Sequence, residues 1–151
     1  MKAQFIFHES GTEKLDEVLA LIRAVFLEFE APDYSDEGIQ EFMRFIKPET
    51  IGKMLSENKI RIWTCEREGR PVGALAASKD HIYLLFVSGQ YHRLGIARRL
   101  FDMMVDCCRP PSITVNSSPY AVEAYRRLGF VNTGTEQTVN GLRFTPMKCM
   151  L

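Results

Sequence analysis

The stretch IYLLFVSGQYHRLGIA, residues 82–97, decides the fold of this chain. Its first six residues are apolar without interruption, which is typical of a strand buried on both faces at the centre of a sheet. A loop that carries Gly95 follows, and apolar residues then recur at helical spacing from Ile96 to Cys107. The pattern predicts a central strand that runs through a loop into a helix whose apolar stripe includes Cys107.

The loop within this stretch suits a phosphate group. Unpaired backbone N–H groups and the positive end of the helix dipole meet where a helix begins, and the small residues Gly95 and Ala97 would let a ligand approach the backbone. Basic side chains surround the loop, at His92, Arg93, Arg98 and Arg99. A plain strand-to-helix connection with solvated arginines would show the same features, so the loop alone leaves both interpretations open. The glycine spacings of a dinucleotide fold and of a P-loop are absent.

The segments around this stretch predict an α/β domain, an α+β arrangement with a mixed sheet of about six to seven strands. Residues 60–66 and 71–78 would form an antiparallel meander with residues 82–87. Residues 112–116 form a strand that is reached through a helix, so it should lie parallel to residues 82–87. The other expected elements are a strand at 5–7, helices at 15–29, from 35 onward, at 48–57 and at 118–128, and a hairpin at 140–141.

Length and composition narrow the class of protein. The 151 residues fit one domain, residues 1–151, and Lys+Arg and Asp+Glu balance at 19 each, which argues against a nucleic-acid or anionic-membrane partner. Apolar runs are too short for a signal peptide or a membrane span. Because the four cysteines form no CxxC pair, we expect reduced, mostly buried thiols and a cytoplasmic location. His8 and His81 lack ligand partners at metal-site spacing, so no metal is expected.

A second motif, VNSSPYAVEAYRRLGF, occupies residues 115–130. Ser118 and Pro119 are expected to begin the last helix, as its N-cap and first residue, and Gly129 to end it where a positive φ is needed. Tyr125 and Leu128 would share one face of this helix.

At this point the sequence resembles the GNAT superfamily of acetyl-CoA-dependent N-acetyltransferases. The first motif is similar to that family's pyrophosphate loop, [QR]-x-x-G-x-[GA], with His92 in the first place. The second is similar to its last strand and helix, N-x-x-A-x-x-x-Y-x-x-x-G-F, which Ala121, Tyr125, Gly129 and Phe130 match. The bacterial branch resembled most carries NSSPYA before this helix, and its substrates are mostly unassigned. Two positions depart from the pattern: His92 replaces Gln or Arg, and Ser118 stands where Asn is common, with Asn116 two residues earlier.

The resemblance implies a splay between the fourth and fifth strands, residues 82–87 and 112–116, where the pantetheine arm of acetyl-CoA inserts. The cofactor-binding residues that it implies are Phe86, Val87, His92, Arg93, Leu94, Gly95, Ile96, Ala97, Arg98, Asn116, Ser118 and Tyr125. It also implies three catalytic positions: a main-chain N–H near Val87 for the oxyanion, Tyr125 as the acid that protonates the leaving thiolate, and Asn116 in the place of the family's Asn.

The acceptor is expected to be a primary amine, on a small molecule or a peptide, that attacks the thioester directly. Phe26, Phe29, Glu30 and Tyr34, around the end of the first helix, are the candidate acceptor-binding residues; the two phenylalanines could equally belong to the core. No general base is evident, although Glu28, Glu30 or Asp33 could relay a proton. A non-catalytic acyl-CoA sensor on the same fold therefore remains the alternative, and a homodimer would be common for the family.

Overall fold

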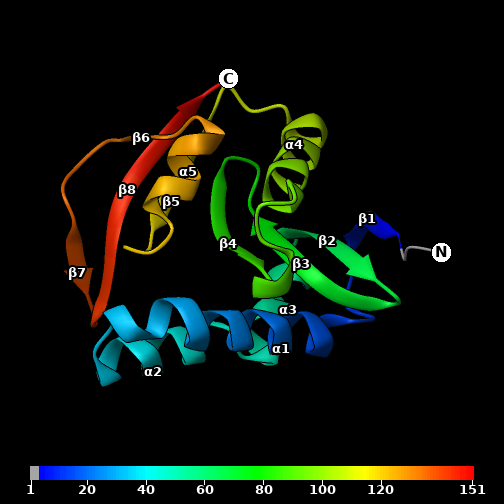
Figure 1. Ribbon diagram of the computed structural model, residues 1–151, viewed down its shortest axis with the longest axis horizontal. Coiled ribbons are helices and arrows are strands. Elements are labelled where there is room, and N and C mark those ends of the chain that lie inside the picture. Colours follow the sequence, from blue (N-terminus) through cyan, green and yellow to red (C-terminus); the bar gives the residue numbers. More distant parts are fainter. Residues whose placement is uncertain (1–3) are drawn as a thin grey trace.

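A mixed eight-stranded sheet runs through residues 4–151, the part of the chain that the computed structural model describes (Figure 1). The strands lie in the order β1-β2-β3-β4-β5-β8-β6, and β7 pairs with β8. The strands are β1 (Phe5–Ser10), β2 (Arg61–Arg67), β3 (Arg70–Ala77), β4 (His81–Val87), β5 (Ser112–Ser117), β6 (Val131–Asn132), β7 (Gln137–Val139) and β8 (Leu142–Met150). The helices are α1 (Leu15–Val25), α2 (Asp36–Phe45), α3 (Pro48–Ser56), α4 (Ile96–Cys108) and α5 (Val122–Leu128).

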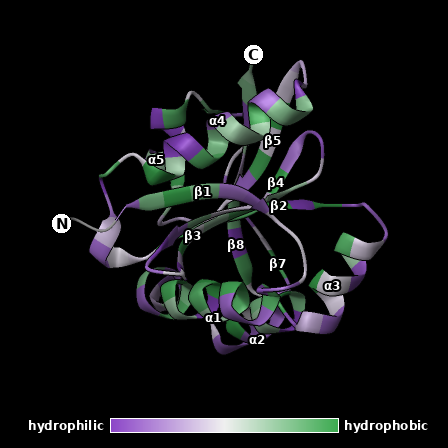
Figure 2. Ribbon diagram, turned by 90° about the vertical axis from the view of Figure 1, so that its right-hand side faces the viewer, coloured by the Kyte–Doolittle hydropathy of each residue, from purple (hydrophilic) through white to green (hydrophobic). Residues whose placement is uncertain are grey.

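Helices cover both faces of the sheet, with α1, α2 and α3 on one side and α4 and α5 on the other (Figure 2). Strand alternation divides the core accordingly, because neighbouring side chains on a strand point to opposite faces. On β2, Ile62 packs with the α1 layer, whereas Trp63 packs with the α4 layer. Strand β3 repeats the division, with Ala74 on the first side and Leu75 on the second. The expected α/β fold class and mixed sheet are confirmed, although the sheet has eight strands instead of about six to seven, because the short β6 and β7 add to it.

Strands β4 and β5 are parallel, as predicted, but they pair only at the first two residues of β4, opposite the middle of β5. Their register joins His81 to Thr114 and Ile82 to Val115, and no pair follows among the described residues. By contrast, β5 pairs with β8 along its whole length, from Ser112 to Ser117. The two parallel strands therefore diverge toward their carboxyl ends, which confirms the expected splay.

Local signals in the sequence placed several boundaries correctly. The Ser35 hydroxyl caps α2 by accepting a hydrogen bond from the Gly38 N–H at 3.3 Å. Gly129 ends α5 with φ +107°. Asn140 and Gly141 turn the β7–β8 hairpin with φ values of +53° and +81°, the conformation that an Asn-Gly turn favours.

Three expectations about burial and boundaries were wrong. Strand β4 is not buried on both faces: Tyr83 is 42% exposed, because it lies beside the pocket described below. Helix α5 begins at Val122, and Ser118 instead accepts from the Ala121 N–H at 3.3 Å in a turn before the helix. Cys107 is exposed, because the last turn of α4 contacts the core through Cys108 instead.

Candidate active site

The register of β3 with β4 decides which backbone groups face the splay. Ser88 donates its N–H to the Val72 carbonyl at 2.8 Å, so these two residues form a hydrogen-bonded pair of the antiparallel ladder. Such pairs alternate with pairs whose N–H and C=O groups point away from each other. Val87 lies opposite Gly73 and Leu85 opposite Leu75, both in the second type of pair. The backbone groups of Leu85 and Val87 therefore point toward β5, where the strands have separated.

The same alternation turns the backbone of Phe86 toward β3, opposite Ala74. The resemblance predicted strand-like hydrogen bonds between the pantetheine arm and the backbone of Phe86 and Val87. The backbone groups that face the splay are instead those of Leu85 and Val87. Phe86 instead contributes its ring, which lines the pocket. Sequence reasoning missed Leu85, although the predicted hairpin between residues 71–78 and 82–87 would have given the alternation once its register was known.

The loop between β4 and α4 has the features of an anion-binding loop. Gly95 is the N-cap of α4 with φ +82°, and a Cβ at this position would meet no atom within 4 Å. The backbone at the start of the 13-residue helix is therefore open to a ligand. Arg93 also has a positive φ, +62°, which is strained for a side chain of this size. Leu94 is 60% exposed on the same loop, while Ile96 is buried and can offer only its backbone.

Two basic side chains of the predicted phosphate site are engaged elsewhere. His92 Nε2 lies 2.7 Å from the carbonyl oxygen of Val87, so its ring closes back on the strand that precedes the loop. The Arg98 guanidinium donates to the Arg127 carbonyl at 2.6 Å. Backbone N–H groups and the helix dipole, rather than these two side chains, are what the loop presents to an anion.

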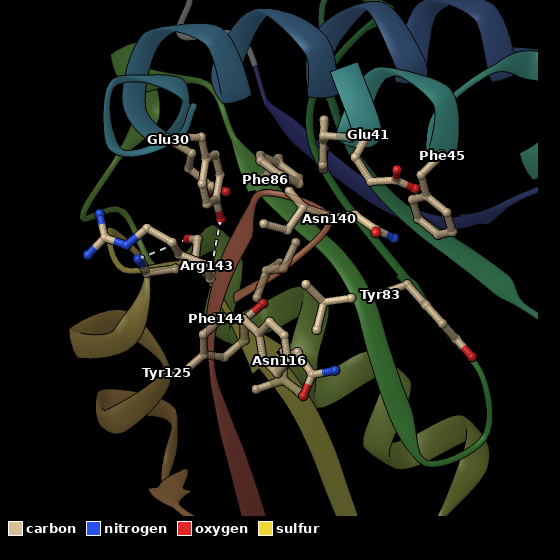
Figure 3. Close-up of a pocket in the computed structure, with 18 residues that line it drawn as sticks. Glu30, Glu41, Phe45, Tyr83, Phe86, Asn116, Tyr125, Asn140, Arg143 and Phe144 are labelled. Atoms are coloured by element: carbon tan, nitrogen blue, oxygen red, sulfur yellow. Dashed lines mark hydrogen bonds between the residues drawn. The ribbon is translucent and has the colours of Figure 1, made fainter. Parts of the chain in front are cut away.

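A pocket of about 300 Å³ opens beside the splay (Figure 3). Strand β4 contributes Tyr83, Leu85 and Phe86 to its wall, and β5 contributes Asn116. The remaining sides are formed by helix α2, the β7–β8 hairpin, the turns that follow α1, and the loop and helix that follow β5. Of the predicted site residues, the pocket brings together Glu30, Tyr34, Phe86, Asn116, Ser118 and Tyr125.

Glu30 reaches the pocket through an irregularity in the first helix. After α1 the chain forms a π-helical turn, Phe26–Glu30, and then a 3₁₀ turn, Ala31–Asp33. Single π turns inside helices are rare and often occur at functional sites. Burial raises the pKa of Glu30 from 4.5 to about 7; a hydrogen bond with Ser118 opposes this rise, and the charge of Asp33 adds to it. A carboxyl group with this pKa can take up a proton near neutral pH.

Tyr125 enters the same pocket from α5 and is only 6% exposed (Figure 3). Burial raises its pKa, and the charge of Glu30 raises it further. The two side chains are therefore close enough to sense each other's charge. The ring of Tyr125 packs edge-on against Phe130, with 5.4 Å between centroids.

The two predicted acceptor phenylalanines lie outside this pocket. Phe26 is fully buried and stacks on Phe42 with 3.9 Å between ring centroids, so it supports the pocket wall from behind. Phe29 lies between His92 and Tyr120, at 4.9 and 5.2 Å between centroids. Its ring thereby connects the loops that follow β4 and β5, on either side of the splay.

Two glycines close the far wall of the pocket. A Cβ at Gly38 would lie 2.2 Å from the carbonyl oxygen of Gly141, and a Cβ at Gly141 would lie 2.4 Å from the Gly38 nitrogen. The hairpin tip therefore rests directly on the first turn of α2, which no other residue at either position would permit without a shift. Sequence reasoning identified the turn at residues 140–141 but could not show where its tip packs.

Most charges around the pocket are already paired. Glu41 binds Arg44 with an Oε2–Nη2 distance of 2.7 Å. Arg143 binds Glu136 at 3.2 Å and donates to the Asp33 carbonyl at 3.0 Å. Among residues 4–151 no cation lies within ion-pair distance of Glu30. Glu30 is thus the pocket's one unpaired charge within the described part of the chain.

Two further features bear on other classes of site. No group of three His, Cys, Asp or Glu residues in the described range is arranged to hold a metal ion. No described helix has the length and apolar character needed to cross a bilayer.

A mixed sheet splayed between two parallel strands, with an open helix N-terminus beside the splay, is an acyltransferase architecture of the GNAT type. The model of the acetyltransferase (GNAT) domain family matches residues 30–151, and the chain belongs to this family of N-acetyltransferases. The family uses acetyl-CoA as the acetyl donor. No curated protein sequence matches the chain.

Solved structures share the fold at low sequence identity. A GCN5-related N-acetyltransferase from Rhodopseudomonas palustris is 22% identical with a TM-score of 0.81, over 100% of this chain and 99% of that one. The PaiA N-acetyltransferase from Thermoplasma acidophilum, solved in complex with coenzyme A, is 13% identical with a TM-score of 0.79, over 98% and 99%. A GNAT acetyltransferase from Staphylococcus aureus is 14% identical with a TM-score of 0.75, over 98% and 99%. At these identities the likeness concerns the fold alone.

Proposed function

We propose that this protein transfers the acetyl group of acetyl-CoA to a primary amine. The amine attacks the thioester directly, within a ternary complex of protein, acetyl-CoA and amine. One observation carries the proposal: Glu30, with a pKa of about 7, and Tyr125 reach into one pocket that opens on the splay. These side chains supply an acceptor and a donor of protons at the place where a thioester between β4 and β5 would meet an amine.

The residues proposed to hold acetyl-CoA follow from the open backbone groups. The start of α4 at Gly95, with the strained Arg93 beside it, faces the pyrophosphate. Leu85 offers its N–H and C=O groups to the pantetheine arm, whereas the Val87 carbonyl is already engaged by His92. The Val87 N–H stabilises the oxyanion that forms at the thioester carbonyl. Asn116 and Ser118 line the opposite side of the pocket, at the end of β5.

The bound ammonium ion loses one proton to the Glu30 carboxylate, which keeps it during the transfer and releases it to solvent afterwards. The neutral nitrogen attacks the thioester carbon, the C–S bond breaks, and the departing thiolate takes its proton from Tyr125. The second proton of the attacking nitrogen then restores Tyr125. The products are an amide, a free thiol and one proton released to water.

The electrostatic link between the two residues favours this order. Burial and, to a smaller extent, a charged Glu30 raise the pKa of Tyr125, so the phenol stays protonated while the amine binds. Once Glu30 has accepted the proton of the amine, its charge no longer opposes a phenolate at Tyr125. Removal of a proton from the nucleophile thus prepares donation of a proton to the leaving group.

The sensor hypothesis rested on the lack of an evident base, and Glu30 is a candidate for that role. We further propose that residues 1–151 act as one domain, in the cytoplasm, with a homodimer as the assembly to test by light scattering. The experiment for the function is an acetyl-CoA-dependent screen of amines, read as thiol release and as the mass of the acetylated product. In parallel, acetyl-CoA should raise the melting temperature, because it binds only the folded state. Such a rise without turnover of any amine would favour the sensor.

A further inference from the structure

The charges around the pocket select for a particular kind of amine. Glu30 lacks a cationic partner among residues 4–151, so an ammonium group on the acceptor would form an ion pair with it. Arg143, the cation that lines the pocket, is held by Glu136 at two of its nitrogens, 3.2 Å each, and by the Asp33 carbonyl. A carboxylate or phosphate on the acceptor would therefore find no free cation and would face Glu30.

The second carboxylate of the wall does not call for a second ammonium group. Glu41 is already bound to Arg44 at 2.7 Å, one turn further along α2. A polyamine would have to displace Arg44 to gain this partner. The pocket thus offers one site for one positive charge.

Aromatic rings contribute much of the rest of the wall. Seven of the lining residues carry aromatic rings: Tyr34, Phe42, Phe45, Tyr83, Phe86, Tyr125 and Phe144. Phe45 and Tyr83 stack with 6.1 Å between centroids, on the side of the pocket away from Glu30 (Figure 3). Aromatic walls suit a flat apolar group, which gains both burial and ring contacts, whereas a sugar would have to find its hydrogen-bond partners at Asn116, Ser118 and Asn140.

The volume suits a small acceptor. About 300 Å³ lies at the lower end of the range for ligand pockets, and the thioester end of the donor would share this space. We propose that the acceptor is a small arylalkylamine: one primary ammonium group on a short chain that ends in an aromatic ring, without an acidic group. This inference rests on the proposed function and names the acceptor class of the same site.

The test compares acceptors that differ by one feature, at saturating acetyl-CoA. 2-Phenylethylamine is the probe, L-phenylalanine adds only a carboxylate, ethylamine lacks only the ring, and spermidine and kanamycin represent polyamines and aminoglycosides. We expect kcat/KM for 2-phenylethylamine to exceed that for each of the others by at least about tenfold. Preference for phenylalanine, spermidine or kanamycin would overturn the acceptor class while leaving amine acetylation intact.

A pair of variants separates the pocket from the chemistry. Phe45→Ala removes a half-buried ring of the wall, so KM for 2-phenylethylamine should rise about tenfold while kcat/KM for ethylamine stays unchanged. Val131→Ala, at an exposed position on β6, is the matched control and should change neither. Equal effects of Phe45→Ala on both amines would contradict the inference.

If no amine is turned over, the proposed function fails but the acceptor class can still be decided. Calorimetric titration of 2-phenylethylamine into the protein loaded with coenzyme A should show binding that Phe45→Ala weakens. Absence of binding to the folded, loaded protein would overturn the inference independently of turnover.

Discussion

Replacement of Glu30 by Gln tests the proposed base, because the change keeps the shape of the side chain and removes its titration. The pKa of about 7 implies that kcat/KM of the wild type rises about tenfold per pH unit below pH 7 and levels off above it, since only the carboxylate accepts a proton. General base catalysis contributes roughly 10²–10⁴-fold. In Glu30→Gln, kcat/KM at pH 8 should therefore fall by about this factor, and the increase of kcat/KM with pH that is centred near pH 7 should disappear.

The same raised pKa has a consequence for stability that needs no substrate. A carboxyl group whose pKa rises from 4.5 to about 7 on folding stabilises the protein below pH 4.5, and this contribution is lost as the pH rises through 7. The difference, at about 1.4 kcal/mol for each unit of pKa, amounts to at most about 3.5 kcal/mol. The free energy of unfolding of Glu30→Gln, relative to that of the wild type, should thus increase by up to this amount from pH 4 to pH 8.

The assays are pH profiles of kcat/KM and urea unfolding at 25 °C over the same pH range. Glu28→Gln is the matched control, since Glu28 is exposed on the same π-helical turn. It should alter neither profile. An unchanged rise of activity near pH 7 in Glu30→Gln would refute Glu30 as the base, and a constant stability difference across the range would refute its raised pKa.

Three further changes test other parts of the site. Tyr125→Phe keeps the ring but removes the acid, so kcat should fall roughly 10²–10⁴-fold while calorimetry finds acetyl-CoA affinity nearly unchanged; a loss of affinity alone would make Tyr125 a binding contact. Gly95→Glu places a negative side chain at the open start of α4, and coenzyme A affinity should drop at least about tenfold, about 1.4 kcal/mol, with an unchanged circular dichroism spectrum. Gly38→Ala must push the hairpin tip from α2, so KM for the amine should rise and the melting temperature fall while acetyl-CoA affinity persists; equal effects on both ligands would contradict this wall of the pocket.

Much of the fold could be predicted because its signals are local. The period of apolar residues distinguishes α1 from β2, and the Ser35 cap and the Asn140-Gly141 turn mark boundaries through their own backbone chemistry. The parallel pairing of β4 and β5 follows from the helix between them. The splay itself came from the family resemblance, since no residue in either strand signals the divergence.

The site could be predicted only in part, because it depends on contacts between distant segments. His92 occupies the expected place in the loop, but its ring turns back to Val87, which the motif does not encode. Glu30 gains its raised pKa from burial beside Ser118, and a residue 88 positions away cannot be recognised as a neighbour from one sequence. The Gly38–Gly141 contact, which closes the pocket, is equally non-local.

The most direct test of the central claim is the stoichiometry of acetyl transfer under single-turnover conditions. Wild-type protein mixed with one equivalent of acetyl-CoA and excess 2-phenylethylamine, or the best amine of the screen, should release one thiol for each N-acetylated product detected by mass spectrometry. Tyr125→Phe should give the same final ratio at a rate slower by roughly 10²–10⁴-fold. Thiol release without an acetylated amine would show hydrolysis instead of transfer, and acetyl-CoA that binds but stays intact with every amine would contradict the proposed enzyme.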